Sequence, residues 1–332
     1  MKFLICGIGS AGQRHYGNLQ KLGHELALFR SRQHTTPFID QFFEEQKKNG
    51  QAVEIFHDLE RALRVFKPDG VFVTNPISSH VHTALTVARA GCHLFIEKPV
   101  SHTLEGIDEL KDLMLKNSLR LMVGYNLRFH PLLREMKALC DGGAIGKLLS
   151  AHAELAENID DWHPWEDYRD SYAAYKSGGG GAVFNFSHDI DLLYWFFGMP
   201  RRVFAVGGKL TPLIGDVDDM TKSVLEFRDG SIASLHLDIW QRPPRHWFEV
   251  IGTEGKLLWD YYDESLILIS RDKPPIKKVW HNPAGFERND MFVDEVEDFI
   301  RAIQDNREPL ITLDQGAEVL NIALEILKQL RI

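Results

Sequence analysis

The sequence predicts an α/β protein with an α+β second part: a doubly wound parallel sheet first, then an open antiparallel sheet. Short apolar runs alternate with helical stretches as far as residue 123, beginning with FLIC at residues 3–6. This alternation is typical of a parallel sheet covered by helices on both faces. From Lys147 onward, apolar and polar residues alternate along segments joined by turns such as Arg228-Asp229-Gly230, which predicts antiparallel strands.

The size of the chain fits two domains. It has 332 residues, of which 44% are hydrophobic, enough for two cores of ordinary size. We place a dinucleotide-binding domain at residues 1–123 and a substrate and oligomerisation domain at residues 124–332. We expect a C-terminal helix, at about 313–330, to pack back on the first domain.

Charge and cysteine usage exclude several classes of protein. The net charge is -9 and the chain has no long run of Lys or Arg, which argues against a nucleic-acid partner. Cys6, Cys92 and Cys140 are scattered and lack metal-type spacing, so we expect reduced thiols and no metal site. The first apolar run is too short for a signal peptide or a membrane span. We expect a cytoplasmic protein with no membrane partner.

A glycine turn follows the first predicted strand. Gly7, Gly9 and Gly12, with Ser10 and Ala11 between them, form a GxGxxG pattern that opens a helix ending near residue 23. Glycines in this position let backbone N–H groups approach a pyrophosphate at a helix N-terminus. The pattern therefore predicts a Rossmann domain that binds a dinucleotide.

The end of the second strand, residues 25–29, should contact the adenosine ribose. An acidic residue there would bind the 2'-hydroxyl of NAD, but the sequence has Arg30, Ser31 and Arg32. Arginine offers a bidentate donor fork to phosphate oxygens. We therefore expect NADP to be preferred, with NAD as the alternative.

Two further strand ends should meet the same crevice. Four more strands are expected at 53–56, 71–74, 93–96 and 121–123, with helices at 35–50, 58–66, 80–90 and 104–116. Ligands of open α/β sheets bind at the carboxyl ends of the strands. We accordingly predict that the cofactor contacts Thr74, Asn75, Pro76, Glu97 and Lys98, together with His80. No partner at metal-ligand spacing accompanies His80 or His82, and a structural or capping role for both is the alternative.

The exit from the sixth strand, GYNLRF at residues 124–129, should lie over the nicotinamide end of the crevice. Asn126 is a predicted cofactor contact and Tyr125 a predicted substrate contact. Arg128 either holds an anionic group of the substrate or pairs with a carboxylate of the other domain. A helix at residues 130–140 follows.

The second domain contains a meandering sheet with one polar and one apolar face, and an aromatic insertion. Strands are expected at 148–156, 202–209, 222–227, 231–240, 248–251, 256–260 and 265–270, with helices at 291–305 and 313–330. Trp165, Tyr168 and Arg169 lie in a segment rich in aromatic and hydrogen-bonding groups. Such a composition suits a sugar or nucleotide contact, and it also occurs at protein interfaces.

A helix after the tetraglycine at residues 178–181 carries candidate catalytic groups. Asn185 and His188 are one turn apart, and so are His188 and Asp191, so all three should share a face. A histidine is the natural proton shuttle when a hydroxyl becomes a carbonyl.

Four motifs together resemble the Gfo/Idh/MocA family of NAD(P)-dependent oxidoreductases: the glycine turn, TNP followed by histidine, AGCHLFIEKP, and VGYNLRFHPLL. The resemblance implies that Lys98 bonds the substrate hydroxyl and that His188 transfers the proton. It also implies that the open sheet supports a homo-oligomer, a dimer or a tetramer. Asn185 departs from the family pattern, which has an aspartate there, and Asp191 is a candidate for the missing carboxylate.

The leading hypothesis is a dehydrogenase or reductase acting on a secondary hydroxyl or ketone of a sugar or nucleotide sugar. This requires Lys98 and His188 to act on one substrate. One alternative is a glycosidase that keeps NAD bound and oxidises its substrate transiently. A dinucleotide-binding regulator without turnover is the other.

Overall fold

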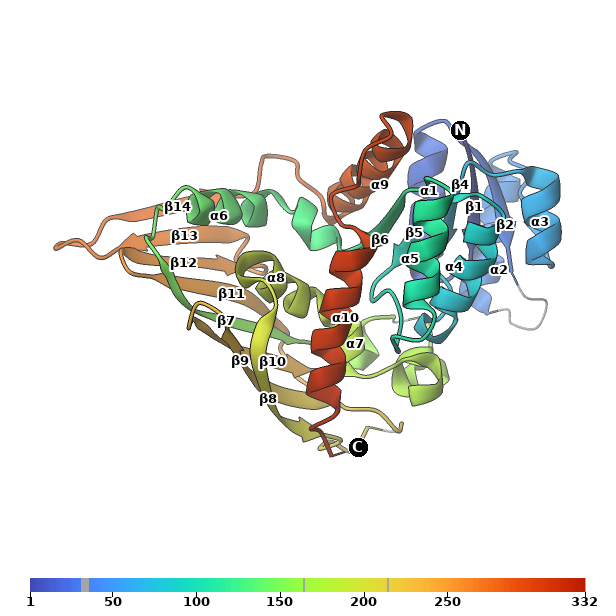
Figure 1. The fold of residues 1–332 in the computed structure, drawn as a ribbon. Helices are drawn as coiled ribbons and strands as arrows, with labels where there is room; N and C mark the ends of the chain where they lie inside the picture. The colour runs from blue at the N-terminus through green and yellow to red at the C-terminus, as the bar shows by residue number, and fades with distance from the viewer. Residues whose placement is uncertain (31–35, 164, 214, 332) are drawn as a thin grey trace. The chain divides into compact units, whose positions relative to one another are not determined.

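The computed structural model describes residues 1–30, 36–163, 165–213 and 215–331 (Figure 1). The chain divides into two compact units, one of residues 1–124 and 292–317, the other of residues 125–291 and 318–332. Within the described ranges, no helix is both long enough and apolar enough to cross a membrane. The predicted domain limits, 1–123 and 124–332, stay a prediction.

The first unit contains a parallel six-stranded sheet in the order β3-β2-β1-β4-β5-β6. Its strands are β1 (Lys2–Cys6), β2 (Glu25–Phe29), β3 (Glu54–Phe56), β4 (Gly70–Val73), β5 (His93–Glu97) and β6 (Leu121–Gly124). All neighbouring pairs are parallel. The order reverses at β1 and β4, which is the switch point of a doubly wound sheet, so the prediction for this part is confirmed.

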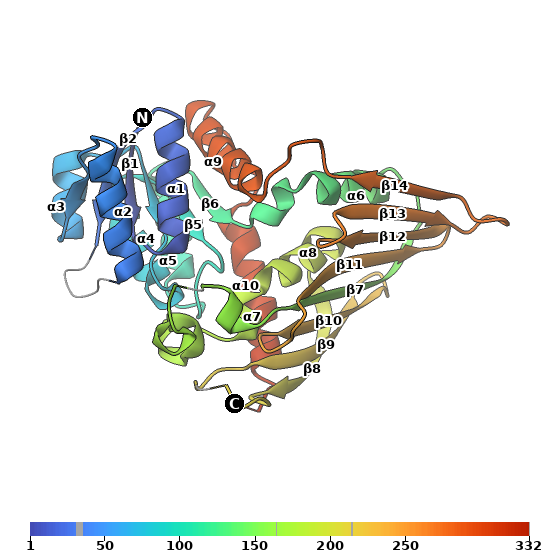
Figure 2. The ribbon, with the colours of Figure 1, turned by 180° about the vertical axis from the view of Figure 1, so that it is seen from behind.

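Helices cover both faces of this sheet. They are α1 (Ser10–Lys21), α2 (Pro37–Lys48), α3 (Leu59–Phe66), α4 (His80–Arg89) and α5 (Ile107–Lys116). Seen from opposite sides, α4 and α5 lie over one face and α1 and α2 over the other (Figures 1 and 2). Side chains cap two of them: Thr36 accepts from the N–H of Ile39, and Asp58 from that of Arg61, each satisfying a backbone donor at a helix start.

An aromatic cluster forms the core beneath the site. Phe3, Phe72 and Phe95 are fully buried. The rings of Phe72 and Phe95 stack with centroids 4.8 Å apart. Phe299, from α9 (Arg288–Gln304), packs edge-on against both at 5.6 and 5.8 Å. This packing holds β4 and β5, whose ends carry the predicted site residues, in one rigid layer.

The second unit contains an eight-stranded sheet in the order β14-β13-β12-β11-β7-β10-β9-β8. Its strands are β7 (Leu148–Ala156), β8 (Pro200–Gly208), β9 (Met220–Phe227), β10 (Ile232–Asp238), β11 (Arg245–Gly252), β12 (Gly255–Asp260), β13 (Ser265–Ser270) and β14 (Lys277–His281). The sheet is not a simple meander, because β7 lies between β11 and β10 and pairs with β10 in parallel. Sequence patterning missed β14, whose residues are largely exposed and begin with two lysines.

Helices cover one face of this sheet. The second unit contains α6 (Pro131–Asp141), α7 (Ala182–Asn185) and α8 (Ser187–Phe197), and the part of α10 (Leu313–Leu327) from residue 318 onward. Phe196 of α8 packs edge-on against Phe248 of β11, with centroids 5.0 Å apart. The expected single helix after the tetraglycine is wrong, because the chain breaks at Phe186, whose φ of -99° and ψ of 24° are not helical.

The opposite face of the sheet is not as polar as predicted. Along β9, Thr221, Ser223 and Leu225 are buried, whereas Val224 is 47% exposed. On neighbouring β8, Val206 is 70% exposed. Apolar side chains therefore stand on the solvent side of the sheet, where strand periodicity alone would place polar ones.

Candidate functional site

The glycine turn after β1 is tightly packed against the end of β4. Gly7 has φ +106°, and a Cβ placed on it would lie 2.8 Å from the backbone N of Asn75. A Cβ on Gly12 would lie 2.1 Å from the carbonyl oxygen of Gly7. Thr74 Oγ1 donates to that same oxygen at 2.9 Å. Only glycine fits at either position, as a dinucleotide-binding turn requires.

Gly9 differs from the other two glycines. A Cβ on Gly9 would meet no protein atom within 4 Å, so packing does not explain it. Gly9 caps α1 without a side-chain hydrogen bond, and the first turn of α1 has no acidic residue. The helix therefore starts with backbone N–H donors and the positive end of its dipole available for an anion. With Ser10 and Ala11 in this first turn, the residues present fit a dinucleotide pyrophosphate.

The ribose end of this site is described only at Arg30. Its guanidinium lies over the ring of Phe43, 5.4 Å from the centroid, and its backbone N–H donates to Phe56 on β3. Ser31 and Arg32, also predicted to contact the ribose, lie outside the described residues.

The end of β4 places Asn75 beside the glycine turn. Asn75 Nδ2 donates to Thr83 Oγ1 at 2.8 Å, while its backbone carbonyl lies 2.8 Å from His80 Nε2. Pro76 then leads into a short 3-10 helix (Ile77–Ser79). His80 is 1% exposed, and its Nδ1 lies 3.0 Å from the carbonyl oxygen of Pro99. Burial lowers the pKa of His80, although the two carbonyl contacts oppose this.

Lys98 follows β5 directly, and the residue before it is held by a buried histidine. Glu97 Oε1 lies 2.7 Å from Nε2 of His15, which is fully buried on α1. Glu97 Oε2 accepts the backbone N–H of Lys98 at 3.2 Å. Burial alone would raise the pKa of Glu97, but His15 and the charge of Lys98 hold it below its usual value. Glu97 is therefore an ionised carboxylate at neutral pH.

In the second unit, Arg128 belongs to a 3-10 helix (Asn126–Phe129) and is 2% exposed. Its Nε and Nη2 donate to the two carboxylate oxygens of Asp191 at 2.9 and 2.7 Å. Asp191 is 1% exposed. A carboxylate of the other domain, one of the two partners expected for Arg128, is therefore wrong for this ion pair, because Asp191 lies in the same unit. The substrate contact of Arg128 stays a prediction. Asn126, a predicted cofactor contact, is 4% exposed in the same short helix.

His188 lies one turn before Asp191 on α8. The ring of Tyr125 stands edge-on to the His188 ring, with centroids 5.9 Å apart. Burial raises the pKa of Tyr125, and the charge of Asp191 adds to this. Tyr125 is therefore a neutral phenol at physiological pH, able to donate a hydrogen bond.

Asn185 is the last residue of α7, on the other side of the Phe186 break from His188. Its Nδ2 donates to the carbonyl oxygen of Gly181 at 2.8 Å. This amide therefore closes the short helix that the tetraglycine opens. An amide can orient a hydroxyl but cannot accept its proton. The catalytic roles assigned to Asn185, His188 and Asp191 stay predictions.

The aromatic insertion forms three 3-10 turns, at Tyr168–Asp170, Tyr172–Ala174 and Lys176–Gly178. Trp165 is 44% exposed and Tyr172 is 42% exposed. Arg169 pairs with the carboxylate of Asp167 two residues earlier. Exposed indole and phenol faces next to charged groups can stack on a sugar.

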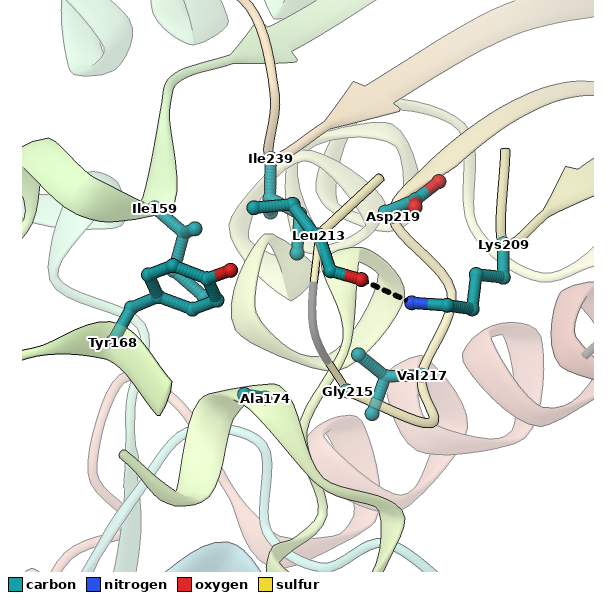
Figure 3. A pocket seen from close by; sticks show the side chains of 9 residues that line it. All are labelled: Ile159, Tyr168, Ala174, Lys209, Leu213, Gly215, Val217, Asp219 and Ile239. Atoms are coloured by element: carbon teal, nitrogen blue, oxygen red, sulfur yellow. Dashed lines mark hydrogen bonds between the residues drawn. The ribbon is translucent and has the colours of Figure 1, made fainter. Parts of the chain in front are cut away.

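Tyr168 lines a small pocket in the second unit (Figure 3). The pocket has a volume of about 210 Å³ and is lined by Ile159, Tyr168, Ala174, Lys209, Leu213, Gly215, Val217, Asp219 and Ile239. Lys209 Nζ donates to the carbonyl oxygen of Leu213 at 2.5 Å. The 210 Å³ includes space open to solvent, so we do not assign this pocket to the substrate.

Sequence reasoning missed three buried ionisable groups, which are His15, Glu295 and His246. His15 and Glu295 lie in the first unit and are fully buried. In the second unit, His246 Nε2 lies 3.1 Å from Oδ2 of the fully buried Asp189. Glu295 could have been noticed from the sequence, because it is a charged residue on the apolar face of a helix. The contact of His246 with Asp189 could not, because no spacing rule connects residues so far apart in sequence.

Comparison with known proteins agrees with this fold and these motifs. Residues 1–125 match the model of the oxidoreductase family with an NAD-binding Rossmann fold, and residues 133–258 match that of the GFO/IDH/MocA C-terminal domain. The chain belongs to the Gfo/Idh/MocA oxidoreductase family, as its motifs predicted. Its first unit is an NAD-binding Rossmann fold.

Individual relatives are distant. The chain is 26% identical over 228 residues to 2,7-anhydro-N-acetylneuraminate hydratase of Mediterraneibacter gnavus, which covers 65% of this chain and 59% of that protein. It is 24% identical to myo-inositol 2-dehydrogenase of Thermotoga maritima, over 99% of this chain and 96% of the relative. A levoglucosan dehydrogenase solved with NADH and levoglucosan superposes with a TM-score of 0.85 at 20% identity, covering 99% and 96% of the two chains.

Proposed function

We propose that this chain transfers a hydride between a nicotinamide cofactor and a secondary hydroxyl or ketone of a sugar. The main support for the proposal is that two functional features lie at the same edge of the parallel sheet. The β1 turn fits a pyrophosphate, and Lys98 follows β5 at the same edge. Ligands of doubly wound sheets bind at this edge. The dehydrogenase relatives named above support a sugar as substrate.

In this proposal, the side chains of Lys98 and His188 handle the hydroxyl proton of the substrate. When bound, the cofactor supplies the hydride acceptor or donor. During oxidation, the Lys98 ammonium donates a hydrogen bond to the reacting oxygen, and His188 accepts the hydroxyl proton. Tyr125 stands edge-on to His188 and orients its ring. That Lys98 and His188 act on one substrate remains part of the proposal.

For the cofactor, we propose a preference for NADP over NAD. Arg30 directly follows β2, where NAD-specific domains commonly carry an acid. A guanidinium at this position attracts a 2'-phosphate.

The substrate class is proposed more narrowly as a sugar derivative or nucleotide sugar. The exposed Trp165 and Tyr172 supply stacking faces, which suit a sugar ring or a base. A cytoplasmic location, expected from the cysteines, also stays a prediction.

One alternative is a reaction without net oxidation, in which the hydride leaves and returns. A hydratase relative favours it, because hydration changes no overall oxidation state. The NAD-dependent glycosidase predicted as an alternative belongs to the same redox-neutral class. A regulator without turnover is the third candidate.

We also propose that the chain forms a homo-oligomer through the open sheet. The exposed Phe204, Val206, Val224 and Ile232 lie on β8, β9 and β10. An apolar sheet face of this kind often marks an interface. Light scattering of the full chain and of Val206→Glu tests this proposal, and a monomeric wild-type chain contradicts it.

One experiment separates the candidate activities. The purified chain is mixed with NAD or NADP and a panel of sugars, and reduced nicotinamide is followed by absorbance while products are followed by mass spectrometry. A dehydrogenase reduces the cofactor in step with product, whereas a redox-neutral enzyme forms product without net reduction. Lys98→Met should abolish either reaction, and Lys116→Met, which changes an exposed lysine of α5, should not. Binding without any product supports the regulator.

A further inference from the structure

Lys98 lies between Glu97 and Pro99, and each of these two residues contacts a buried histidine. On one side, Glu97 is 2.7 Å from His15 of α1. On the other side, the carbonyl oxygen of Pro99 is 3.0 Å from His80 of α4, whose other ring nitrogen reaches Asn75 at the end of β4. Both rings are almost completely buried. The backbone on each side of Lys98 is therefore fixed to a different helix.

Glu295 of α9 completes the cluster around His15. Its side chain is fully buried, and neither carboxylate oxygen has a hydrogen-bond partner within the described residues. Ligating atoms of His15, Glu97 and Glu295 all lie within 4.8 Å of one another. The rings of Phe72 and Phe95 lie 5.2 and 4.9 Å from that of His15. Two carboxylates therefore lie near one imidazole in apolar surroundings, and only Glu97 is hydrogen-bonded to it.

Two ionised carboxylates in such surroundings would leave an uncompensated charge. Burial raises the pKa of Glu295 well above its usual value, the charge of Glu97 adds to this, and Arg14 opposes it. The other ionisable groups around the cluster are Lys98 beside Glu97 and His80 across β5, and burial lowers the pKa of His80. A proton on Glu295 leaves Glu97 as the single carboxylate charge beside Lys98.

We propose that His15 and His80 are positioning residues for Lys98, and that Glu295 beside His15 stays protonated. His15 and His80 fix the two sides of the strand exit, and Glu295 holds a proton so that Glu97 alone faces the lysine as a carboxylate. This inference depends on the proposed function, in which Lys98 acts at the nicotinamide end of the site.

The same three side chains could in principle ligate a divalent cation, since histidine and carboxylates are common metal ligands. The geometry favours a proton, because the 2.7 Å separation of His15 and Glu97 is a direct hydrogen bond. A cation between them would have to break that bond. Metal content is therefore measured as part of the test.

The first measurement is binding to the full chain at neutral pH. NADH reaches the nicotinamide end of the site, whereas AMP occupies only the adenosine end. His15→Gln and His80→Gln should each weaken NADH about tenfold, as the loss of one hydrogen bond predicts, and AMP by less than about twofold. His82→Gln is the matched control, because His82 lies exposed on α4. If folded His15→Gln and His80→Gln bind NADH like the wild type, the positioning proposal is wrong.

The second measurement follows Lys98 itself. Acylation of each lysine is quantified by peptide mass spectrometry across pH, with exposed Lys116 as the internal reference. In His15→Gln the profile of Lys98 should shift to lower pH, because Glu97 loses the bond that keeps it ionised. Glu295→Gln, which mimics the protonated acid, should leave the Lys98 profile and NADH affinity unchanged. Glu297→Gln on the exposed side of α9 is its control.

Two outcomes overturn the proton assignment. One is a shift of the Lys98 profile in Glu295→Gln as large as that in His15→Gln, because Glu295 would then be charged. The other is one equivalent of bound metal that Glu295→Gln loses. Failure of the proposed function is distinguishable from both. It appears as unchanged sugar turnover in Lys98→Met, while the lysine profile still reports how Lys98 is held.

Discussion

Arg128 and Asp191 form a buried, two-pronged ion pair, with donor–acceptor distances of 2.9 and 2.7 Å. The guanidinium also lies 5.8 Å from the ring centroid of Tyr194 and 5.7 Å from that of Trp195. Asp191 is one helical turn beyond His188, so this pair ties the helix of the candidate base to the 3-10 helix after Tyr125. Both carboxylate oxygens of Asp191 therefore accept hydrogen bonds from Arg128.

The first prediction concerns this pair. Asp191→Asn should lower the free energy of unfolding by about 3–5 kcal/mol, because it leaves a buried guanidinium without a counter-charge. Urea denaturation followed by tryptophan fluorescence measures the change. Arg169→Gln breaks an exposed pair in the same unit and should leave the midpoint unchanged. Equal effects of the two substitutions would show that burial does not set the strength of the Arg128 pair.

Most of the fold could be predicted from local patterns. The strand at Glu25–Phe29 and the strand at Ser265–Ser270 have the predicted bounds. In the first unit, each apolar run is a parallel strand, buried except for most of β3, and each amphipathic stretch is a helix. The pairing of strands that are distant in sequence was harder to predict from local patterns. The parallel contact of β7 with β10 joins segments about 80 residues apart, and nothing in either strand specifies its direction.

The candidate site could be predicted where backbone geometry demands one residue type. Gly7 and Gly12 fit that rule, because a side chain at either position would clash. The partners of buried charges did not follow any local rule. The pairs Glu97–His15 and Arg128–Asp191 each join two elements that are distant in sequence, so they depend on which elements pack together.

The second prediction concerns the candidate base. His188→Asn should reduce kcat about 10²- to 10⁴-fold for the substrate that the sugar screen identifies, because general-base catalysis is lost. The dissociation constant of NADH should change less than about twofold, since no proton moves on binding. His281→Asn, an exposed position on β14, should match the wild type. An undiminished kcat in His188→Asn would remove this histidine from the mechanism.

The third prediction concerns cofactor choice. Arg30→Ala should weaken NADPH about 10- to 100-fold and NADH by less than about threefold, because only NADPH carries the phosphate that a guanidinium bonds. Fluorescence titration of both cofactors measures this. Arg64→Ala on the exposed side of α3 controls for the loss of a positive charge. Parallel losses for the two cofactors would contradict the NADP assignment.

The last prediction concerns the pH dependence of stability. Asp218 is 2% exposed, and its Oδ2 accepts the N–H of Val183 at 2.8 Å. Burial raises the pKa of Asp218 to about 6, so the folded state holds a proton that the unfolded state releases near pH 4. The contribution of Asp218 to stability is therefore fully present below about pH 4 and falls by about 3 kcal/mol as pH rises to 6 and above. Denaturation curves of the wild type and of Asp218→Asn across this range measure that loss as their difference.

Two variants test the sign of this effect. Asp218→Asn cannot titrate, so the stability of the wild type relative to this variant should decline as pH rises. Asp229 provides the opposite case, because hydrogen bonds from Ser231 lower its pKa. Its contribution is present above its ordinary pKa and is lost as the pH falls, so Asp229→Asn should cost stability mainly at neutral pH. A wild-type chain whose stability rises between pH 4 and 6 relative to Asp218→Asn would show that Asp218 is ionised in the folded state.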